Sequence, residues 1–401
     1  MGIDSLPQTR MYWSADTLHP IIANVLSRDR FESLNRYFTV SEREPDAAPR
    51  NPFSSVRSFI ASLNHSFPQH WQPGRHLALD ESMVSFRGRS DIKQFVPGKP
   101  HPHGYKIWVL ANENYMLQFQ LYQGKAVAGP SIHDMVMQLT SLYRNSHHVL
   151  YIDTLFTSPT LVDSLFNVGI RVCGSVKRNR IGMPSKQQLS TAATDALAKG
   201  AALHMQKGEE KVLTLCTWKD KRLILLLYDH IDPRLSTSLQ RWSKSGEIYQ
   251  LPCPQAIRDY FHHARAVDVI NQLHYSYAPG RKSRRCFTRL VWWLIDICIL
   301  NAYRLWRCDH PHESHLEFRM ALMRELMEQL PEGQRTQQQR SSVHAGAAPH
   351  LTHFSELSDV PSDCAHCSAG RQQRKRTRYI CSACKVHLCI GACFSQYHTQ
   401  Q

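Results

Sequence analysis

Apolar residues recur at helical spacing through the first 72 positions of the chain, as at Leu18 and Ile22. Residues that repeat every three or four positions line one face of a helix, so we expect this region to be helical. Ser14 and Ser27 are the expected N-caps of two helices, and a third helix is expected from about Ser54. The chain therefore opens with a helical domain.

Between residues 73 and 180 the pattern changes to short apolar runs and alternating segments, which predict strands. The expected order of elements is β-β-β-α-β-α-β. Strands are expected around Asp80, at 105–110, at 116–122, around Asp153 and at 171–176, with helices at 134–143 and 158–166. This order predicts a mixed α/β core.

After residue 180 the chain becomes polar and then shows two strand-like runs, 211–218 and 222–228. A helix from near Pro254, an apolar helix near Leu290 and an amphipathic helix around Phe318 follow. The expected domains are a helical domain of residues 1–72 and 279–331, a core of 73–180 and 254–278, an insertion of 181–253, a linker of 332–361 and a terminal cysteine-rich domain of 362–401.

Two of the predicted strands carry an aspartate near their ends, Asp80 and Asp153, and the helix from Pro254 carries Asp268. Strands disfavour Asp, and a buried carboxylate is costly unless it is paired or binds a metal. Taken alone, an Asp after a strand is more often a turn or cap residue. Together, three carboxylates from separate elements could bind a pair of Mg²⁺ or Mn²⁺ ions.

Around these aspartates the chain resembles the piggyBac family of cut-and-paste DNA transposases and their host-domesticated derivatives. The similar segments, in order, are Tyr12-Trp13-Ser14, Ser27-Arg28-Asp29-Arg30-Phe31, Asp80-Glu81-Ser82-Met83, Phe86-Arg87-Gly88-Arg89, Gly98-Lys99-Pro100, Gly104-Tyr105-Lys106, Asp153 with Phe156-Thr157-Ser158, Asn179-Arg180, Ala266-Val267-Asp268, Arg281-Lys282-Ser283, Asn301-Ala302-Tyr303 and the terminal cysteines.

The resemblance implies an RNase H-like core with a catalytic triad of Asp80, Asp153 and Asp268, an insertion between the second and third acids, and a helical domain that dimerises and binds DNA. It also implies Mg²⁺ or Mn²⁺ as cofactor, TTAA target sites, hairpinned ends and seamless excision. The expected order of elements matches an RNase H-like core, with the first carboxylate on the first strand and the second at the end of the fourth.

Two departures from the family pattern weaken the case for activity. The family usually has an Asp three residues after the third triad member, where this chain has Asn271, and the usual Met-Gly-Gly before Val-Asp is replaced by Ala264-Arg265-Ala266. Asn271 retains an oxygen donor for an auxiliary role at the Mg²⁺ site but lacks the charge.

The last 40 residues carry a cluster of cysteines and histidines with the spacing of metal ligands. The candidate zinc ligands are Cys364, Cys367, Cys381, Cys384, His387, Cys389, Cys393 and His398. Two Cys-x-x-Cys pairs followed by a Cys/His set suit two tetrahedral Zn²⁺ sites, for which a cross-braced arrangement is favoured. Because this short segment has little apolar core, metal binding would supply much of its folding free energy.

The charge of the chain favours a polyanionic partner. The formal net charge is +15, from 48 Lys and Arg against 33 Asp and Glu. The resemblance implies that the partner is double-stranded DNA, both as transposon ends and as the TTAA target. The expected phosphate contacts are Lys99, Lys106, Arg178, Arg180, Arg281 and Lys282. No secretory signal is apparent, and the most apolar run, 290–300, is too short and polar to span a membrane, so we expect a nuclear protein and no membrane partner.

Three hypotheses follow. The first is a homodimeric, metal-dependent DNA transposase that cleaves and joins strands. The second is a domesticated, catalytically impaired DNA- or chromatin-binding protein, which Asn271 favours. The third takes the cysteine-rich domain as a protein-interaction module whose DNA binding is incidental.

Overall fold

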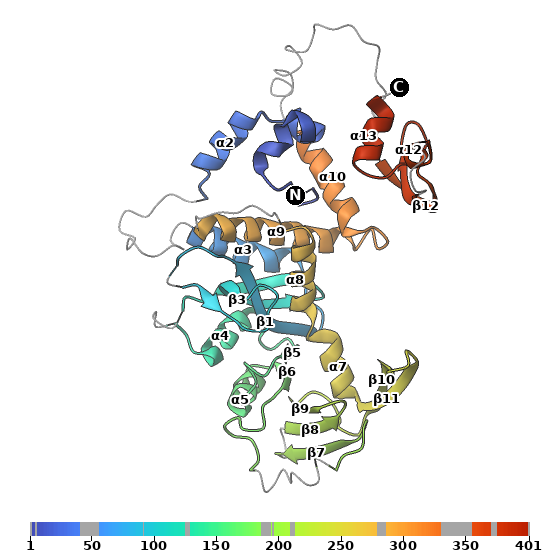
Figure 1. Ribbon diagram of the computed structural model, residues 1–401. Helices are drawn as coiled ribbons and strands as arrows, with labels where there is room; N and C mark the ends of the chain where they lie inside the picture. Colours follow the sequence, from blue (N-terminus) through green and yellow to red (C-terminus); the bar gives the residue numbers. More distant parts are fainter. Residues whose placement is uncertain are drawn as a thin grey trace. The chain divides into compact units, whose positions relative to one another are not determined.

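The computed structural model describes residues 2–4, 6–40, 56–90, 92–124, 129–185, 194, 196–208, 213–278, 286–329, 355–369 and 375–399. The chain divides into two compact units, Met1–Pro331 and Glu332–Gln401, which we describe separately (Figure 1).

The first unit is built on a mixed nine-stranded sheet whose central strands were expected from the sequence. β1 pairs antiparallel with β3, which pairs antiparallel with β4, while β1, β5 and β6 run parallel. The strands are β1 (His76–Ser85), β2 (Gln94–Phe95), β3 (His103–Asn112), β4 (Tyr115–Leu121), β5 (Val149–Ile152) and β6 (Arg171–Ser175). Parallel neighbouring strands need a crossover connection. The connection before β5 contains α4 (Ile132–Leu139) and η4 (Ser141–Tyr143), and the connection between β5 and β6 contains α5 (Pro159–Asn167).

The segment expected as an insertion extends this sheet. β9 (Leu223–Tyr228) pairs antiparallel with β6, and β8 (Leu213–Lys219) and β7 (Ala202–Lys207) follow outward. A separate hairpin is formed by β10 (Ser236–Trp242) and β11 (Ile248–Pro254). The two apolar runs in this segment correspond to β8 and β9, whereas the strands β7, β10 and β11 were not expected from the sequence.

The start of the chain is less helical than expected. After η1 (Thr9–Trp13), Ser14 precedes only the short η2 (Ala15–Thr17), and α1 (Pro20–Ala23) is a single turn, so the expected helix capped by Ser14 is wrong. Pro20 explains the break because the residue before a proline is disfavoured in helical geometry. The next cap is confirmed: Ser27 Oγ accepts from the backbone N–H of Arg30 at the start of α2 (Arg28–Tyr37). α3 (Arg57–His70) follows.

The helix expected from Pro254 is two helices, α7 (Gln255–His263) and α8 (Ala266–Ser276), separated at Ala264 and Arg265. α9 (Cys286–Trp306) and α10 (His315–Glu328) follow, and α10 begins with a capping box between Ser314 and Glu317. α8 packs against β1, β3 and β4, and α9 packs against β4 and β1.

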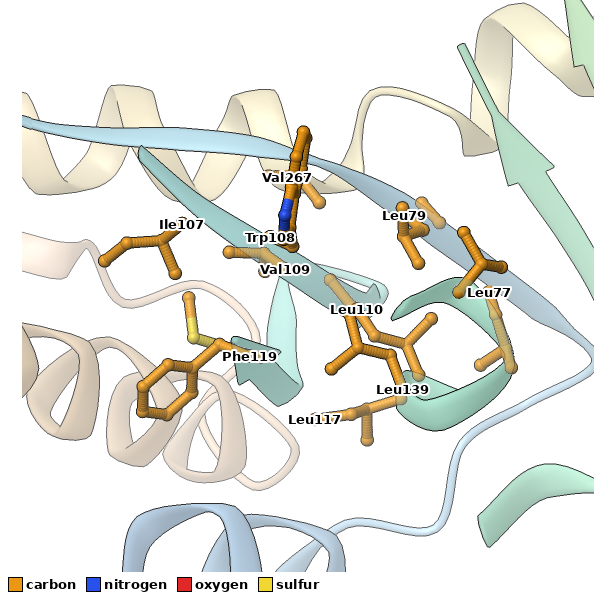
Figure 2. Close-up of a cluster of buried hydrophobic side chains, with 14 of the residues drawn as sticks. Leu77, Leu79, Ile107, Trp108, Val109, Leu110, Leu117, Phe119, Leu139 and Val267 are labelled. Atoms are coloured by element: carbon orange, nitrogen blue, oxygen red, sulfur yellow. The ribbon is translucent and has the colours of Figure 1, made fainter. Parts of the chain in front are cut away.

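The core lies between the central strands and the helices on both faces of the sheet. Leu77 and Leu79 of β1, Leu110 of β3, Leu139 of α4 and Val267 of α8 belong to one cluster of buried apolar side chains (Figure 2). Each large apolar side chain that is fully buried contributes about 1.5–3 kcal/mol to folding. This packing fixes β1 and α8, which carry two of the candidate carboxylates.

The second unit pairs β12 (Ser355–Asp363) antiparallel with β13 (Arg376–Cys381) and adds α12 (Ala365–Ala369) and α13 (Ala392–Thr399). Among the described residues, the helices are too short or too polar to cross a lipid bilayer.

Candidate carboxylate site and cysteine module

Neighbouring parallel strands bring two of the candidate carboxylates to the same level of the sheet. Leu79 of β1 lies opposite Ile152 of β5. Asp80 and Asp153, the residues that follow them, therefore lie at the same level of the sheet. Asp80 is half-buried and its Oδ1 accepts from the backbone N–H of Glu81 at 2.7 Å. Asp153 is exposed at the point where β5 ends.

A tight turn after β5 orients Asp153. Its Oδ1 accepts from the backbone N–H of Thr154 at 2.5 Å and from Ser175 Oγ of β6 at 3.0 Å. Tyr260 of α7 donates its hydroxyl proton to Ser175 Oγ at 3.0 Å, which extends the chain of hydrogen bonds across three elements. The carbonyl of Asp153 accepts from Thr157 Oγ1 at 2.9 Å.

Gly174 of β6 leaves room for that turn. A Cβ at position 174 would lie 2.3 Å from Thr157 Oγ1, too close for any larger residue without a shift of the turn. Close approach of this kind is a common reason for a glycine within a strand.

Helix α8 carries the third carboxylate along β1. Asp268 lies in its first turn, and Asn271 and Tyr275, three and seven positions later, lie on the same side of the helix. Asn271 Oδ1 accepts from Ser82 Oγ at 2.7 Å, and Tyr275 donates to the carbonyl of Met83 at 3.1 Å. These two contacts hold α8 along β1, with Asp268 near Asp80.

Burial of Asp80 disfavours its ionised form. Burial raises the pKa of Asp80 to about 7, Lys99 opposes this, and the negative charges of Asp268 and Glu81 add to it. Burial together with the charges of Asp153 and Asp80 also raises the pKa of Tyr260, so this residue keeps its proton as a donor.

The three carboxylates do not form one tight cluster. Within the described parts of the chain, sets whose ligand atoms all lie within 4.8 Å are found only among the terminal cysteines and histidines. Asp80, Asp153 and Asp268 are nevertheless a donor set of the kind that Mg²⁺ and Mn²⁺ prefer, and a bound cation would stabilise the ionised form of Asp80, which burial disfavours.

Four of the six residues that we expect to contact phosphate make contacts within the protein. Lys106 Nζ lies 2.7 Å and Lys99 Nζ 3.8 Å from the carboxylate of Glu81. Arg178 donates to Thr194 Oγ1 at 2.9 Å, and Arg180 donates to the carbonyls of Thr154 and Leu155 in the turn after β5. The other two, Arg281 and Lys282, lie outside the described residues.

The terminal cysteines and histidines gather in two sets that interleave along the chain. Cys364, Cys367, Cys389 and Cys393 form one, and Cys381, Cys384 and His398 form the other. Although burial favours the thiol, backbone N–H groups of Cys367 and Cys389 lower the pKa of Cys364 to about 7. Four cysteines in one set and two cysteines with a histidine in the other are the donors that structural Zn²⁺ sites use.

His387, expected as an eighth ligand, lies outside both sets. Its Nε2 lies 3.2 Å from the carbonyl oxygen of Val360 on β12. The second set therefore has three protein ligands in this structure.

Sequence reasoning did not identify Ser175, Tyr260, Ser82 or Tyr275 as parts of the carboxylate site. Tyr260 and Ser175 are 85 positions apart in sequence, and neither belongs to a local motif. Only the pairing of strands and the packing of α7 and α8 on them bring these groups to the aspartates.

Comparison with known proteins places this chain among transposases. A model of the family "Transposase IS4" matches residues 1–303. The chain is 25% identical to human PiggyBac transposable element-derived protein 3 over all of its own length and 68% of that protein. It is also 25% identical to human PiggyBac transposable element-derived protein 2, over 79% of this chain and 55% of that protein.

The fold is similar to that of a solved structure, the cryo-EM structure of a piggyBac transposase synaptic complex with hairpin DNA. The TM-score is 0.67 over 97% of this chain and 83% of that one, with 21% identity. This similarity extends to the fold of nearly the whole chain.

Proposed function

The chain belongs to the transposase IS4 family and is of the piggyBac type, and from this premise we propose that it cleaves and joins DNA strands. The proposed catalytic residues are Asp80, Asp153 and Asp268, in an RNase H-like core. The observation that carries the proposal is that Asp80 and Asp153 follow paired residues of neighbouring strands, while Asp268, in the first turn of α8, is near enough to Asp80 to raise its pKa.

The strand order supports an RNase H-like core. β4, β3 and β1 are successive antiparallel neighbours, and β5 and β6 continue the sheet in parallel from β1. In this arrangement the first acid lies on the central strand and the second at the end of the strand beside it. α8, which carries the third acid, packs against β1.

The proposed reaction is hydrolysis of a phosphodiester followed by attack of the freed 3′-hydroxyl on a second strand. Two Mg²⁺ or Mn²⁺ ions, held by the three carboxylates, would supply activation of the attacking oxygen and stabilisation of the leaving one. The chain orients these ligands: Ser175 and Thr154 hold the Asp153 carboxylate, and the Ser82–Asn271 contact holds the helix of Asp268. Below about pH 7 the Asp80 carboxyl holds a proton that it must release to act as a ligand.

Double-stranded DNA is the proposed partner, with TTAA as the target, and we propose a nuclear homodimer. The net charge of +15 supports a DNA partner, as does the hairpin DNA of the similar cryo-EM complex. The terminal module is proposed to bind two structural Zn²⁺ ions and to contact DNA. Its two interleaved ligand sets support the proposed metal binding.

Excision in cells tests this function. A reporter gene interrupted by DNA that carries the terminal sequences flanking the chain's own gene, bounded by TTAA, is expected to regain expression with the wild-type chain. Asp153→Asn is expected to abolish excision, while Asp163→Asn on α5, an exposed carboxylate, serves as a matched control. Equal excision by wild type and Asp153→Asn would contradict the proposal.

A second candidate is a non-cleaving DNA- or chromatin-binding protein derived from such a transposase. The Ser82–Asn271 hydrogen bond favours it, because the amide oxygen that stands in place of a further carboxylate is already engaged within the protein. Retained DNA binding without excision would select this candidate.

A further inference from the structure

A pocket of about 580 Å³ lies where β1 begins, separate from the three carboxylates. Arg75 and His76 line it from the start of β1, His263 from the end of α7, Arg265 from the start of α8, and Arg304 and Arg307 from the end of α9. The turn between β3 and β4 contributes Glu113. The pocket therefore collects side chains from segments that are far apart in the sequence.

The pocket is strongly basic. Four arginines against the single carboxylate of Glu113 give the pocket a net charge of +3. The rings of His76 and His263 stack at 3.7 Å with an angle of 9°. Burial lowers the pKa of both, that of His263 to about 4, so at neutral pH they add polar ring nitrogens rather than charge.

Two of the arginines form the fixed wall of the pocket. Arg304 pairs with the Glu113 carboxylate at 2.5 Å and lies over the ring of Trp71 at 4.5 Å. Arg307 donates to the carbonyl of Pro311 at 2.6 Å. These guanidinium groups are oriented by the fold itself.

The other two arginines are available to a ligand. Arg75 and Arg265 are exposed, and within the described residues their side chains make neither a hydrogen bond nor an ion pair. Arg265 is also the N-cap residue of α8, whose N-terminus has no side-chain cap, and Ala266 of the first turn lines the pocket. Unpaired backbone N–H groups at a helix N-terminus favour an anion, and guanidinium forks bind phosphate oxygens.

We propose that this pocket binds a phosphodiester group of a DNA strand that continues from the carboxylate site. The inference rests on the proposed function, because it takes the strand at Asp80 as its starting point. His76 and Asp80 are four residues apart on one strand, about 13 Å at ~3.3 Å per residue, a distance that a DNA strand covers within a few nucleotides. Ala266 and Val269, which line the pocket, lie on either side of Asp268 in the sequence. One turn of α8 therefore contributes residues to both the pocket and the carboxylate site.

The salt dependence of DNA binding by the full chain tests this assignment. Fluorescence anisotropy of a labelled 30-base-pair duplex, in buffer without divalent ions, gives the slope of log K against log salt concentration for each variant. We expect Arg75→Ala/Arg265→Ala to reduce the slope by about 1.8, or ~0.9 for each phosphate that is no longer neutralised. Arg75→Lys/Arg265→Lys retains the charge and should retain most of the slope.

Lys221→Ala/Arg222→Ala is the matched control, since it removes two exposed positive charges from the turn between β8 and β9. If the control reduces the slope as much as the pocket variant, or if the pocket variant changes nothing, the pocket is not a DNA site. A thermal shift with inorganic tripolyphosphate separates the sources of phosphate. Stabilisation of the wild type, but not of the pocket variant, together with unchanged DNA slopes would assign the pocket to a small polyphosphate and overturn the proposal.

The two proposals can fail independently. A reduced slope in the pocket variant, in a chain that does not cleave DNA, would uphold the pocket and reject the transposase reaction. Cleavage by the wild type with equal slopes in all variants would uphold the reaction and reject the pocket.

Discussion

Asn271 of α8 accepts a hydrogen bond of 2.7 Å from the hydroxyl of Ser82 on β1, one turn after Asp268. Ser82 is fully buried, so this hydroxyl has few alternative partners. The bond ties the helix of the third candidate carboxylate to the strand of the first. The position where the family usually has an acid therefore contributes to the placement of α8.

An acid at this position should strengthen cation binding. We expect Asn271→Asp to retain the hydrogen bond from Ser82 and to lower the Mg²⁺ concentration needed for half-maximal strand cleavage by about fivefold. A further unit charge at ~4 Å is worth about 1 kcal/mol even in water. A Mg²⁺ titration of cleavage measures this, with Asn271→Ala as the control that loses both the hydrogen bond and the oxygen. An unchanged Mg²⁺ requirement would mean that position 271 does not face the cation site.

The raised pKa of Asp80 predicts a specific dependence of stability on pH in the absence of Mg²⁺. Between pH 3.8 and about 7 the folded chain holds a proton that the unfolded chain has lost, so the stability contributed by Asp80 falls as pH rises through this window. Asp80→Asn has no carboxyl to ionise at this position, so its stability does not fall with pH for this reason. We expect the variant to be more stable than wild type at pH 8 by about 2–4 kcal/mol and nearly equal to it at pH 4.5.

Urea unfolding followed by tryptophan fluorescence measures this difference in the first unit, because all eight tryptophans precede residue 307. The buffer should contain neither Mg²⁺ nor a chelator, so that bound zinc is retained. The same stability difference at both pH values would show that burial of Asp80 does not raise its pKa.

The carboxylates could be found from the sequence because Asp80 and Asp153 interrupt or end apolar strands, which is a local signal. Their support could not be found in the same way. Tyr260 reaches Asp153 through Ser175 only because α7 packs against β6, a contact between segments far apart in sequence. The break before α8 has no Gly or Pro to mark it. The strand β10 consists mostly of Ser, Thr, Gln and Arg with few apolar residues, so it has no hydrophobic pattern that predicts a strand.

A buried charge network holds the far end of α8 and should be costly to break. Asp296 of α9 accepts from His274 of α8 at 2.6 Å and from Arg319 of α10 at 2.5 Å, and Arg319 is fully buried. We expect Asp296→Ala to destabilise the first unit by about 3–5 kcal/mol, because the buried Arg319 loses the carboxylate that balances its charge. Urea unfolding measures the loss.

Removal of both charges in this network is the control. Asp296→Leu/Arg319→Met should recover much of the stability, since no unpaired charge remains. A loss below about 1 kcal/mol in Asp296→Ala would show that Arg319 reaches water or another partner.

The two ligand sets of the terminal module predict its zinc content. We expect two Zn²⁺ per chain in the wild type and one in His398→Ala, because His398 belongs to the second set. His387→Ala should retain two, since His387 lies outside both sets. Thiol displacement followed by a colorimetric zinc assay gives these numbers, and loss of one ion in His387→Ala would show that this histidine moves to complete the second set.

The central claim is that Asp80, Asp153 and Asp268 act together as a catalytic site for DNA cleavage. The most direct measurement is strand cleavage of an end-labelled duplex carrying the cognate terminal sequence by the purified chain with Mg²⁺ or Mn²⁺. The account predicts nicking at the end of that sequence by the wild type and by Asp163→Asn, and none by Asp80→Asn although its DNA binding is unchanged. Binding without nicking in every protein, or equal nicking by Asp80→Asn, would contradict it.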